Sequence, residues 1–127
     1  MALTLGNPSG SFPIPTAGRN AIADGFDAAV NTGAGTAVLR LKNASTVLTS
    51  FSLSNPAFGA ASTGVITLSG TTISSTASAG TATAVDNYDI LDRNAASLWA
   101  GAVTGSDTIT TGQTVNLTAF SITFQAS

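Results

Sequence analysis

The part of the sequence that most constrains the fold is the C-terminal run from residue 113 to 125, Q-T-V-N-L-T-A-F-S-I-T-F-Q. Its apolar residues alternate with other residues, first on odd and then on even positions: Val115, Leu117, Phe120, Ile122 and Phe124. Alternation with a period of two is typical of a strand with one buried face and one solvated face. A slip of one residue moves every side chain to the other face unless a bulge absorbs it. The run therefore predicts a bulge at Thr118 and Ala119, or a bend where the chain crosses between two packed sheets.

Charge is the second constraint, because only 8% of the residues are charged, whereas an average globular chain has about 25%. The chain has four bases, six acids, a net charge of -2, and neither His nor Cys. The absence of His and Cys excludes a Ser-His-Asp triad, a cysteine nucleophile, a zinc finger and a disulfide framework. The few scattered bases form no patch that could neutralise phosphates. We therefore expect no enzyme, no cofactor and no nucleic-acid partner.

The apolar residues are spread along the chain and form no targeting or membrane segment. The first residues lack the basic region and apolar run of a signal peptide, and no apolar run approaches the roughly 18 residues of a membrane span. The 127 residues are enough for one domain with a sizeable core. Because a free monomer usually carries more charge, the low charge indicates a surface that is covered in use, as in a component of an assembly.

Residues 1–18 are expected to form an extended N-terminal arm, because three prolines and three glycines between residues 6 and 18 exclude a regular helix. Within the arm, two apolar side chains lie on a stiff polyproline-like segment, Phe12-Pro13-Ile14-Pro15. The arm either packs on its own domain, or is disordered, or docks on a neighbouring subunit. For the last alternative, the candidate partner-binding residues are Phe12, Pro13, Ile14 and Pro15.

Residues 19–31, R-N-A-I-A-D-G-F-D-A-A-V-N, are the only good helix candidate. An apolar stripe at helical spacing predicts its buried face: Ile22, Phe26, Ala29 and Val30. Gly33 follows at the position of a C-terminal glycine. Asp24 and Asp27 lie three residues apart on the predicted outer face. They could be regarded as an acid and base pair, but we interpret them as solvated surface residues.

Eight or so short segments after this helix have strand composition and are separated by turn residues. They cover residues 36–42, 46–53, 64–69, 71–74, 81–92, 97–103, 107–111 and 113–125. Their spacing predicts a mainly β fold, an antiparallel β-sandwich of Ig-like or jelly-roll-like type, as a single domain over residues 19–127. Arg40 and Lys42 alternate with leucines in the first segment, which places them on its solvated face. There they would protect a sheet edge from unwanted pairing.

The segments 81–92 and 97–103 predict a hairpin with a turn at residues 92–95. Its acidic residues are the one constellation for which a metal site can be considered: Asp86, Asp89 and Asp92. Calcium prefers oxygen ligands from loops, but the spacing lacks the D-x-D-x-D-G pattern and a bidentate Glu. In a strand, Asp89 would also point away from its neighbours. We therefore interpret Asp92 as part of the turn and expect no metal site, with a cation in the hairpin as the alternative.

Five stretches are informative when taken together. They read G-R-N-A-I-A-D at 18–24, G-A-G-T-A-V-L-R-L at 33–41, L-S-N-P-A-F-G-A-A-S-T-G-V at 53–65, D-I-L-D-R-N-A-A-S-L-W-A-G at 89–101 and T-G-Q-T-V-N-L-T-A-F-S-I-T-F at 111–124. The chain thereby resembles a group of small virion proteins encoded among the structural genes of tailed bacteriophages. Members typically begin with an A-R-N-A helix, contain an L-x-D-P-A-F-type turn and end on a T-V-x-V-T-S-F-T-I-like strand. The resemblance covers residues 18–127, and the arm at 6–18 is longer than the leader expected of the group.

The resemblance implies a structural, non-enzymatic role as a capsid decoration or cement protein on the virion head. The implied partner is the major capsid protein, with self-association of copies on the capsid surface after assembly in the host cytoplasm. The alternative is a β-sandwich module of the phage tail, fibre or baseplate. Such a module could bind carbohydrate through Tyr88 and Trp99, although both residues are ordinarily expected in the core. Copy number separates the two roles, since a head lattice takes hundreds of copies and a tail takes a few dozen or fewer.

Overall fold

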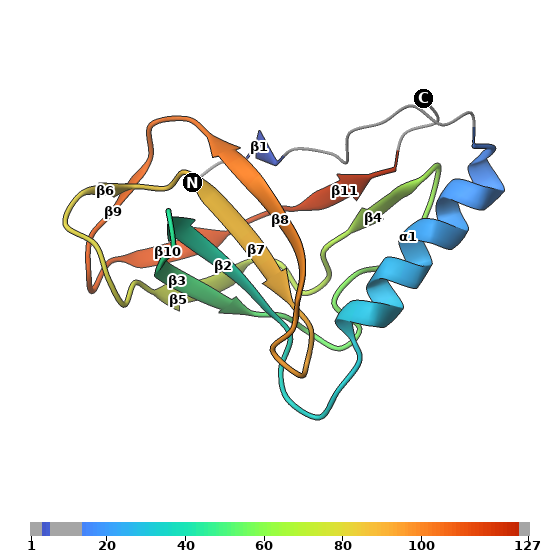
Figure 1. The fold of residues 1–127 in the computed structure, drawn as a ribbon, viewed down its shortest axis with the longest axis horizontal. Helices are drawn as coiled ribbons and strands as arrows, with labels where there is room; N and C mark the ends of the chain where they lie inside the picture. Colours follow the sequence, from blue (N-terminus) through green and yellow to red (C-terminus); the bar gives the residue numbers. More distant parts are fainter. Residues whose placement is uncertain (1–3, 6–13, 125–127) are drawn as a thin grey trace.

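The computed structural model describes residues 4–5 and 14–124 of the chain, and this part is mainly β (Figure 1). It contains one α-helix, α1 (Thr16–Val30). The strands of this part are β1 (Thr4–Leu5), β2 (Val38–Asn43), β3 (Thr46–Ser52), β4 (Val65–Thr67), β5 (Ile73–Thr76), β6 (Thr83–Ala84), β7 (Asn87–Leu91), β8 (Ser97–Thr104), β9 (Thr108–Ile109), β10 (Thr114–Leu117) and β11 (Ser121–Thr123). All their pairings are antiparallel. The mainly β, antiparallel class expected from the sequence is confirmed.

The largest sheet has five strands in the order β1-β8-β7-β2-β3. Because side chains alternate between the two faces of a strand, one face of this sheet is apolar and the other is polar. Leu41 of β2 lies opposite Tyr88 of β7, and both are buried in the core. One residue earlier on β2, Arg40 lies opposite Asp89 on the other face. We call this second face the outer face.

The strand that carries Arg40 and Lys42 lies inside the sheet, between β7 and β3. The expectation that these two cations protect a sheet edge is therefore wrong, although both do lie on the polar face. The alternation in the sequence identifies which face a side chain occupies. It does not show that a distant strand, β7, covers the second edge of β2.

The C-terminal run forms one side of a long ribbon, in which β10 pairs with β5 and β11 pairs with β4. Between the two pairs, residues 68–72 stand opposite residues 118–120, and the backbone N–H of Leu68 donates to the carbonyl of Phe120 at 2.8 Å. The segment 68–72 is longer than the segment 118–120 opposite it. This difference absorbs the predicted one-residue shift in the apolar alternation, so the apolar residues before and after it lie on the same side of the ribbon. The residues before and after the break are accordingly buried: Val115, Leu117, Phe120 and Ile122. Phe124 is half-buried against them.

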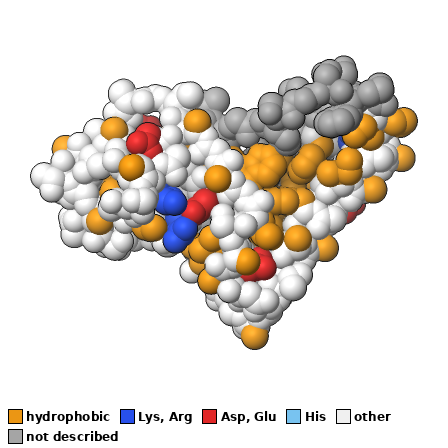
Figure 2. Space-filling view, in the orientation of Figure 1, with side chains coloured by type: hydrophobic (Ala, Val, Ile, Leu, Met, Phe, Trp, Pro, Cys, Tyr) orange, Lys and Arg blue, Asp and Glu red, His pale blue; other side chains and the backbone are white. Residues whose placement is uncertain are grey.

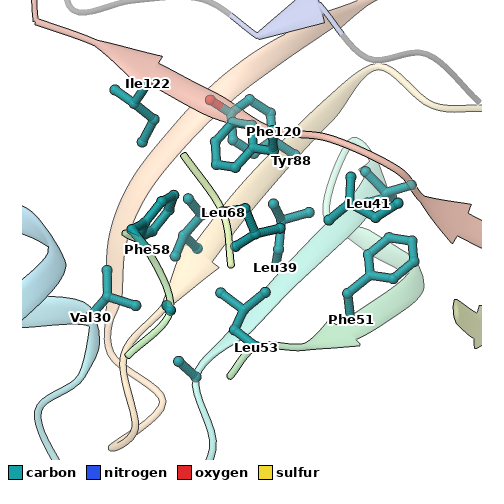
Figure 3. Close-up of a cluster of buried hydrophobic side chains, with 14 of the residues drawn as sticks. Val30, Leu39, Leu41, Phe51, Leu53, Phe58, Leu68, Tyr88, Phe120 and Ile122 are labelled. Carbon is teal, nitrogen blue, oxygen red and sulfur yellow. The ribbon is translucent and has the colours of Figure 1, made fainter. Parts of the chain in front are cut away.

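The core lies between the apolar face of the five-stranded sheet and this ribbon (Figure 3). Figure 3 shows side chains from α1, from the sheet and from the ribbon pointing toward one another. Phe120 joins the layers, since its ring centroid lies 5.8 Å from that of Tyr88 and 6.0 Å from that of Phe58. Burial of such a large apolar side chain contributes about 1.5–3 kcal/mol. The alternating strands therefore supply a core although the chain has no long apolar run.

α1 lies beside β4 (Figure 1) and begins at Thr16, three residues before the predicted start. Pro15 stands at the N-cap position, where a missing N–H is tolerated because the first turn has no intrahelical acceptors. The buried residues of the helix are Ala23 and Val30. The predicted burial of Ile22 is wrong, since this residue is 46% exposed.

A polar stripe on α1 binds the loop 57–64. Four backbone N–H groups of the loop donate to side-chain oxygens of the helix at 2.7–3.0 Å. The donor and acceptor pairs are Gly64 to Asn20, Ala61 to Asp24, Phe58 to Asp27 and Ala57 to Asn31. These contacts matter because a buried N–H without an acceptor costs about 1–3 kcal/mol. The expected exposure of Asp24 is confirmed, whereas the interpretation of Asp27 as a solvated residue is wrong. Both carboxylates hold the loop against the helix, and Asp27 is half-buried.

Candidate functional site

The charged residues of the outer face meet in one cluster, formed by Arg40, Lys42 and Asp89. Arg40 binds the Asp89 carboxylate through Nε at 2.7 Å and through Nη2 at 2.5 Å. Lys42 Nζ lies 3.3 Å from the same carboxylate. The register of β2 and β7 brings the three together, because Arg40 lies opposite Asp89 and Lys42 follows on the same face. Figure 2 shows Lys and Arg side chains next to an acidic side chain on the visible surface.

The cluster contains two cations and one carboxylate. The side chain of Asp89 is 6% exposed, whereas those of Arg40 and Lys42 are 28% and 18% exposed. Burial acts to raise the pKa of the Asp89 carboxyl, but the hydrogen bonds from Arg40 and Lys42 outweigh it and hold this pKa below its ordinary value. The hydrogen bond to Asp89 in turn raises the pKa of Arg40. Asp89 and Arg40 therefore stay ionised at neutral pH, and the cluster as a whole has two basic side chains and one acidic side chain.

The residues around the cluster are small. Ala100 lies opposite Asp89 on β8, and Ser50 lies opposite Arg40 on β3, and both are exposed. They leave the two cations accessible from the outer face. The cluster can therefore offer hydrogen-bond donors to an anionic group, but it contains no nucleophile and no acid and base pair.

Most other charged side chains are bound within the chain as well. Arg19 donates to the carbonyl oxygens of Ile14 and Thr63 and to the hydroxyl of Thr16. Hydrogen bonds between described residues engage eight charged side chains in all: Arg19, Asp24, Asp27, Arg40, Lys42, Asp86, Asp89 and Asp92. Only Arg93 and Asp107 have no such side-chain bond to any described residue. The charge that the chain can offer to a partner is correspondingly small.

The three aspartates of the predicted acidic hairpin serve three separate contacts. Asp86 accepts the backbone N–H of Ala44 at 3.0 Å, and Asp89 belongs to the outer-face cluster. Asp92 accepts the backbone N–H groups of Asn94 and Ala96 at 2.8 and 2.9 Å, which confirms its interpretation as part of the hairpin turn. Among the described residues, no group of three or more acidic side chains could hold a metal ion.

Tyr88 and Trp99 contact each other across β7 and β8, as the predicted hairpin suggests. The indole N–H of Trp99 donates to the Tyr88 phenol oxygen at 2.5 Å. Tyr88 is fully buried, and the Trp99 ring packs against Phe26 and Phe124 at centroid distances of 5.6 and 6.3 Å. The two aromatic residues thus lie on the apolar face of the sheet, as core residues do. Together they do not form an exposed platform for a sugar ring.

The predicted arm is described only in part, because Phe12 and Pro13 lie outside the described residues. Ile14 is half-buried, and its carbonyl accepts the Nε–H of Arg19 at 3.2 Å. Pro15 is exposed at the N-cap of α1. Nearer the N-terminus, β1 pairs with the end of β8. Ile14 and Pro15 therefore belong to the start of the helix, and partner binding by the arm stays a prediction.

The sequence pointed to the members of the outer-face cluster separately and missed the cluster itself. Arg40 and Lys42 were predicted on a polar strand face, and Asp89 was considered only with the other aspartates. The available signal was opposite charge at matching alternation in two strands, since oppositely charged cross-strand pairs stabilise a sheet by roughly 0.2–1 kcal/mol. Using that signal requires knowing that β2 and β7 are neighbours.

Comparison with known proteins identifies no relative, because no family model, curated protein or solved structure matches this chain. In the ranges 4–5 and 14–124, no helix is long and apolar enough to cross a membrane.

Proposed function

We propose that this protein is a structural protein of a bacteriophage virion, a capsid decoration or cement protein that binds the lattice of the major capsid protein and stabilises the head. The observation that carries the proposal is that most charged side chains form hydrogen bonds within the chain and few remain for a partner. Eight of them are hydrogen-bonded within the described part of the chain. The exposed residues there are mostly Ser, Thr, Ala and Gly.

A surface of small side chains with few unpaired charges suits permanent contact with other protein surfaces. A protein that remains free at high concentration usually depends on net charge for its solubility. A subunit fixed on a lattice depends instead on buried apolar area and hydrogen bonds. The resemblance to small virion proteins of tailed bacteriophages supports the same role. The proposed location is the capsid surface, where copies also contact one another, after assembly in the host cytoplasm.

We infer the finer fold from the arrangement of the core. The five-stranded sheet and the ribbon of β4, β5, β10 and β11 enclose one set of buried side chains. This arrangement supports a β-sandwich, with α1 packed beside β4. A sandwich of this kind presents a whole sheet face to a partner, as a protein that covers a capsid surface needs. The alternative of a sugar-binding tail module gains no support, because Tyr88 and Trp99, its proposed binding residues, pack within the core.

The experiment that tests the proposed function is reconstitution on particles that lack the protein. Purified protein is mixed with such heads, and the heads are sedimented and washed in low salt and in roughly molar salt. Because screening weakens exposed charge contacts and leaves apolar contacts almost unaffected, we expect similar occupancy after both washes. Tails purified from the same virus serve as the matched control. Binding to tails in preference to heads would contradict the proposal.

A further inference from the structure

On the outer face, two basic side chains share one carboxylate, and the side chains around them are small. Arg40 uses Nε and Nη2 for Asp89, and its Nη1 makes no hydrogen bond to any described residue. Among the described residues, the Lys42 ammonium group makes only the 3.3 Å contact to Asp89, although it has three donors. These side chains are 28% and 18% exposed, and their remaining N–H groups can donate to one more carboxylate without displacing Asp89.

One aspartate side chain has no hydrogen-bond partner in the part of the chain that the structure describes. Asp107 is exposed, and it is the one acidic residue whose side chain makes no hydrogen bond to a described residue. Its backbone carbonyl accepts the N–H of Val85 at 3.2 Å, and the next residue, Asp86, donates its N–H to the carbonyl of Lys42 at 3.1 Å. These two bonds place Asp107 at the same end of the sheet as Lys42.

We propose that a second copy of this chain binds to the outer face, so that the Asp107 carboxylate of each copy contacts the Arg40 and Lys42 side chains of the other. An interface with two-fold symmetry uses the same patch on both copies, so the patch must contain both members of each pair. The outer face and its end satisfy this condition, with cations at Arg40 and Lys42 and, at Asp107, an exposed carboxylate that no described residue binds through a hydrogen bond. Two equivalent pairs then form for each contact between copies.

The surroundings of the cluster suit such a contact between two sheet faces. Ala100 and Ala102 are exposed on β8 and lie opposite Asp89 and Asn87. Small side chains let two sheets approach closely, whereas long ones would hold them apart. An exposed ion pair contributes only about 0.2–1 kcal/mol, so the dimer is weak in dilute solution. On a surface that holds the copies close together, the high effective concentration would favour it.

This self-association rests on the proposed function, since it specifies the contact between copies on the capsid. It is measured on the purified protein without capsids, so its failure can be told apart from failure to bind heads. The chain contains no cysteine, so a cysteine introduced at one position reacts alone. The variants Asp107→Cys and Lys42→Cys are prepared separately, mixed at high concentration and treated with a short bismaleimide. We expect a covalent dimer in the mixture and little in either variant alone. The matched control is a mixture of Arg93→Cys with Lys42→Cys, because Arg93 is a base on the hairpin turn outside the proposed contact.

A second measurement does not require new cysteines. Sedimentation equilibrium compares the intact chain with Asp107→Asn and Arg93→Gln. We expect Asp107→Asn to weaken the dimer by about 2- to 30-fold, which corresponds to loss of two exposed pairs, and Arg93→Gln to leave it unchanged. The proposal is overturned if the intact chain stays monomeric at millimolar concentration or if Asp107→Asn associates as the intact chain does. It is also overturned if the Asp107→Cys mixture yields no more covalent dimer than the control mixture.

Discussion

The indole N–H of Trp99 donates to the phenol oxygen of Tyr88 at 2.5 Å, across the neighbouring strands β8 and β7. Tyr88 reaches this position because the residue opposite it is Gly101. A Cβ on Gly101 would lie 2.5 Å from Cε1 of Tyr88 and 2.8 Å from its phenol oxygen. The ring of Tyr88 therefore occupies the space that any other residue at 101 would fill.

Replacement of this glycine tests the packing directly. We expect Gly101→Ala to lower the free energy of unfolding by about 1–3 kcal/mol, the usual effect of overpacking a core, as measured by urea denaturation. The matched control is Gly25→Ala, because a Cβ at that position in α1 would meet no atom within 4 Å apart from the adjacent residues and the backbone of the helix itself. This control should stabilise the protein by about 0.5–1 kcal/mol, the difference between Gly and Ala inside a helix. An unchanged stability of Gly101→Ala would show that Tyr88 is free to move away.

The same pair predicts how Tyr88 ionises. Burial raises the pKa of the Tyr88 phenol, and the hydrogen bond from Trp99 offsets only part of this effect. Because the folded pKa lies above the unfolded value of about 10, the contribution of Tyr88 to stability is complete below pH 10 and is lost as the pH rises through the folded pKa. Tyr88 is the only tyrosine, so ultraviolet absorbance titration reports on it alone. A native protein that ionises at the same pH as the chain in denaturant would contradict the burial.

The break in the C-terminal run can be tested with one residue from each side. Leu117 and Ile122 are both buried, so Leu117→Ala and Ile122→Ala should each lower the free energy of unfolding by about 2–5 kcal/mol. The exposed Thr118 lies between them, and Thr118→Ala should change stability by less than about 0.5 kcal/mol. A negligible effect of either core variant would place its side chain outside the core. It would also contradict the inference that the irregularity at residues 118–120 keeps both sets of apolar residues in one core.

Period-two alternation was sufficient to predict the strands around this break and the burial on both sides of it. Each of those predictions depends on neighbours in the sequence. The polar stripe of α1 could not be predicted in the same way, because Asp24 and Asp27 bind backbone N–H groups more than thirty residues away. A carboxylate on a helix has the same sequence signal whether it faces water or a loop.

The same limitation applies to the outer-face cluster. The sequence placed Arg40 and Lys42 on the correct face of a strand, but the pairing of β2 with β7 decides that both cations meet Asp89. Strand order also decides that β2 is an inner strand. Local patterns therefore predict which face a residue occupies, and only the tertiary pairing reveals its partner.

The predicted role of the arm can be tested by deleting residues 1–13, which leaves α1 complete because it begins at Thr16. The deletion removes β1, which pairs with the end of β8, and we expect the shortened protein to keep its helix and its other strands by circular dichroism. We also expect it to bind heads more weakly, because Phe12, Pro13 and their neighbours would supply apolar contacts whose ordering is aided by proline. A variant with Phe12→Ala alone separates the side chain from the rest of the arm. Equal binding by the shortened and intact proteins would place attachment on the sheets and loops.

The most direct test of the proposed function is a density map of the virus particle that carries this protein. The fold provides a distinctive shape to locate, with a five-stranded sheet, an interrupted ribbon and one helix beside it (Figure 1). A decoration or cement protein should occupy every equivalent position of the head lattice, with hundreds of copies on the outer surface of the major capsid protein. Density for the protein on the tail or baseplate, in a few dozen copies or fewer and absent from the head, would contradict the proposed function.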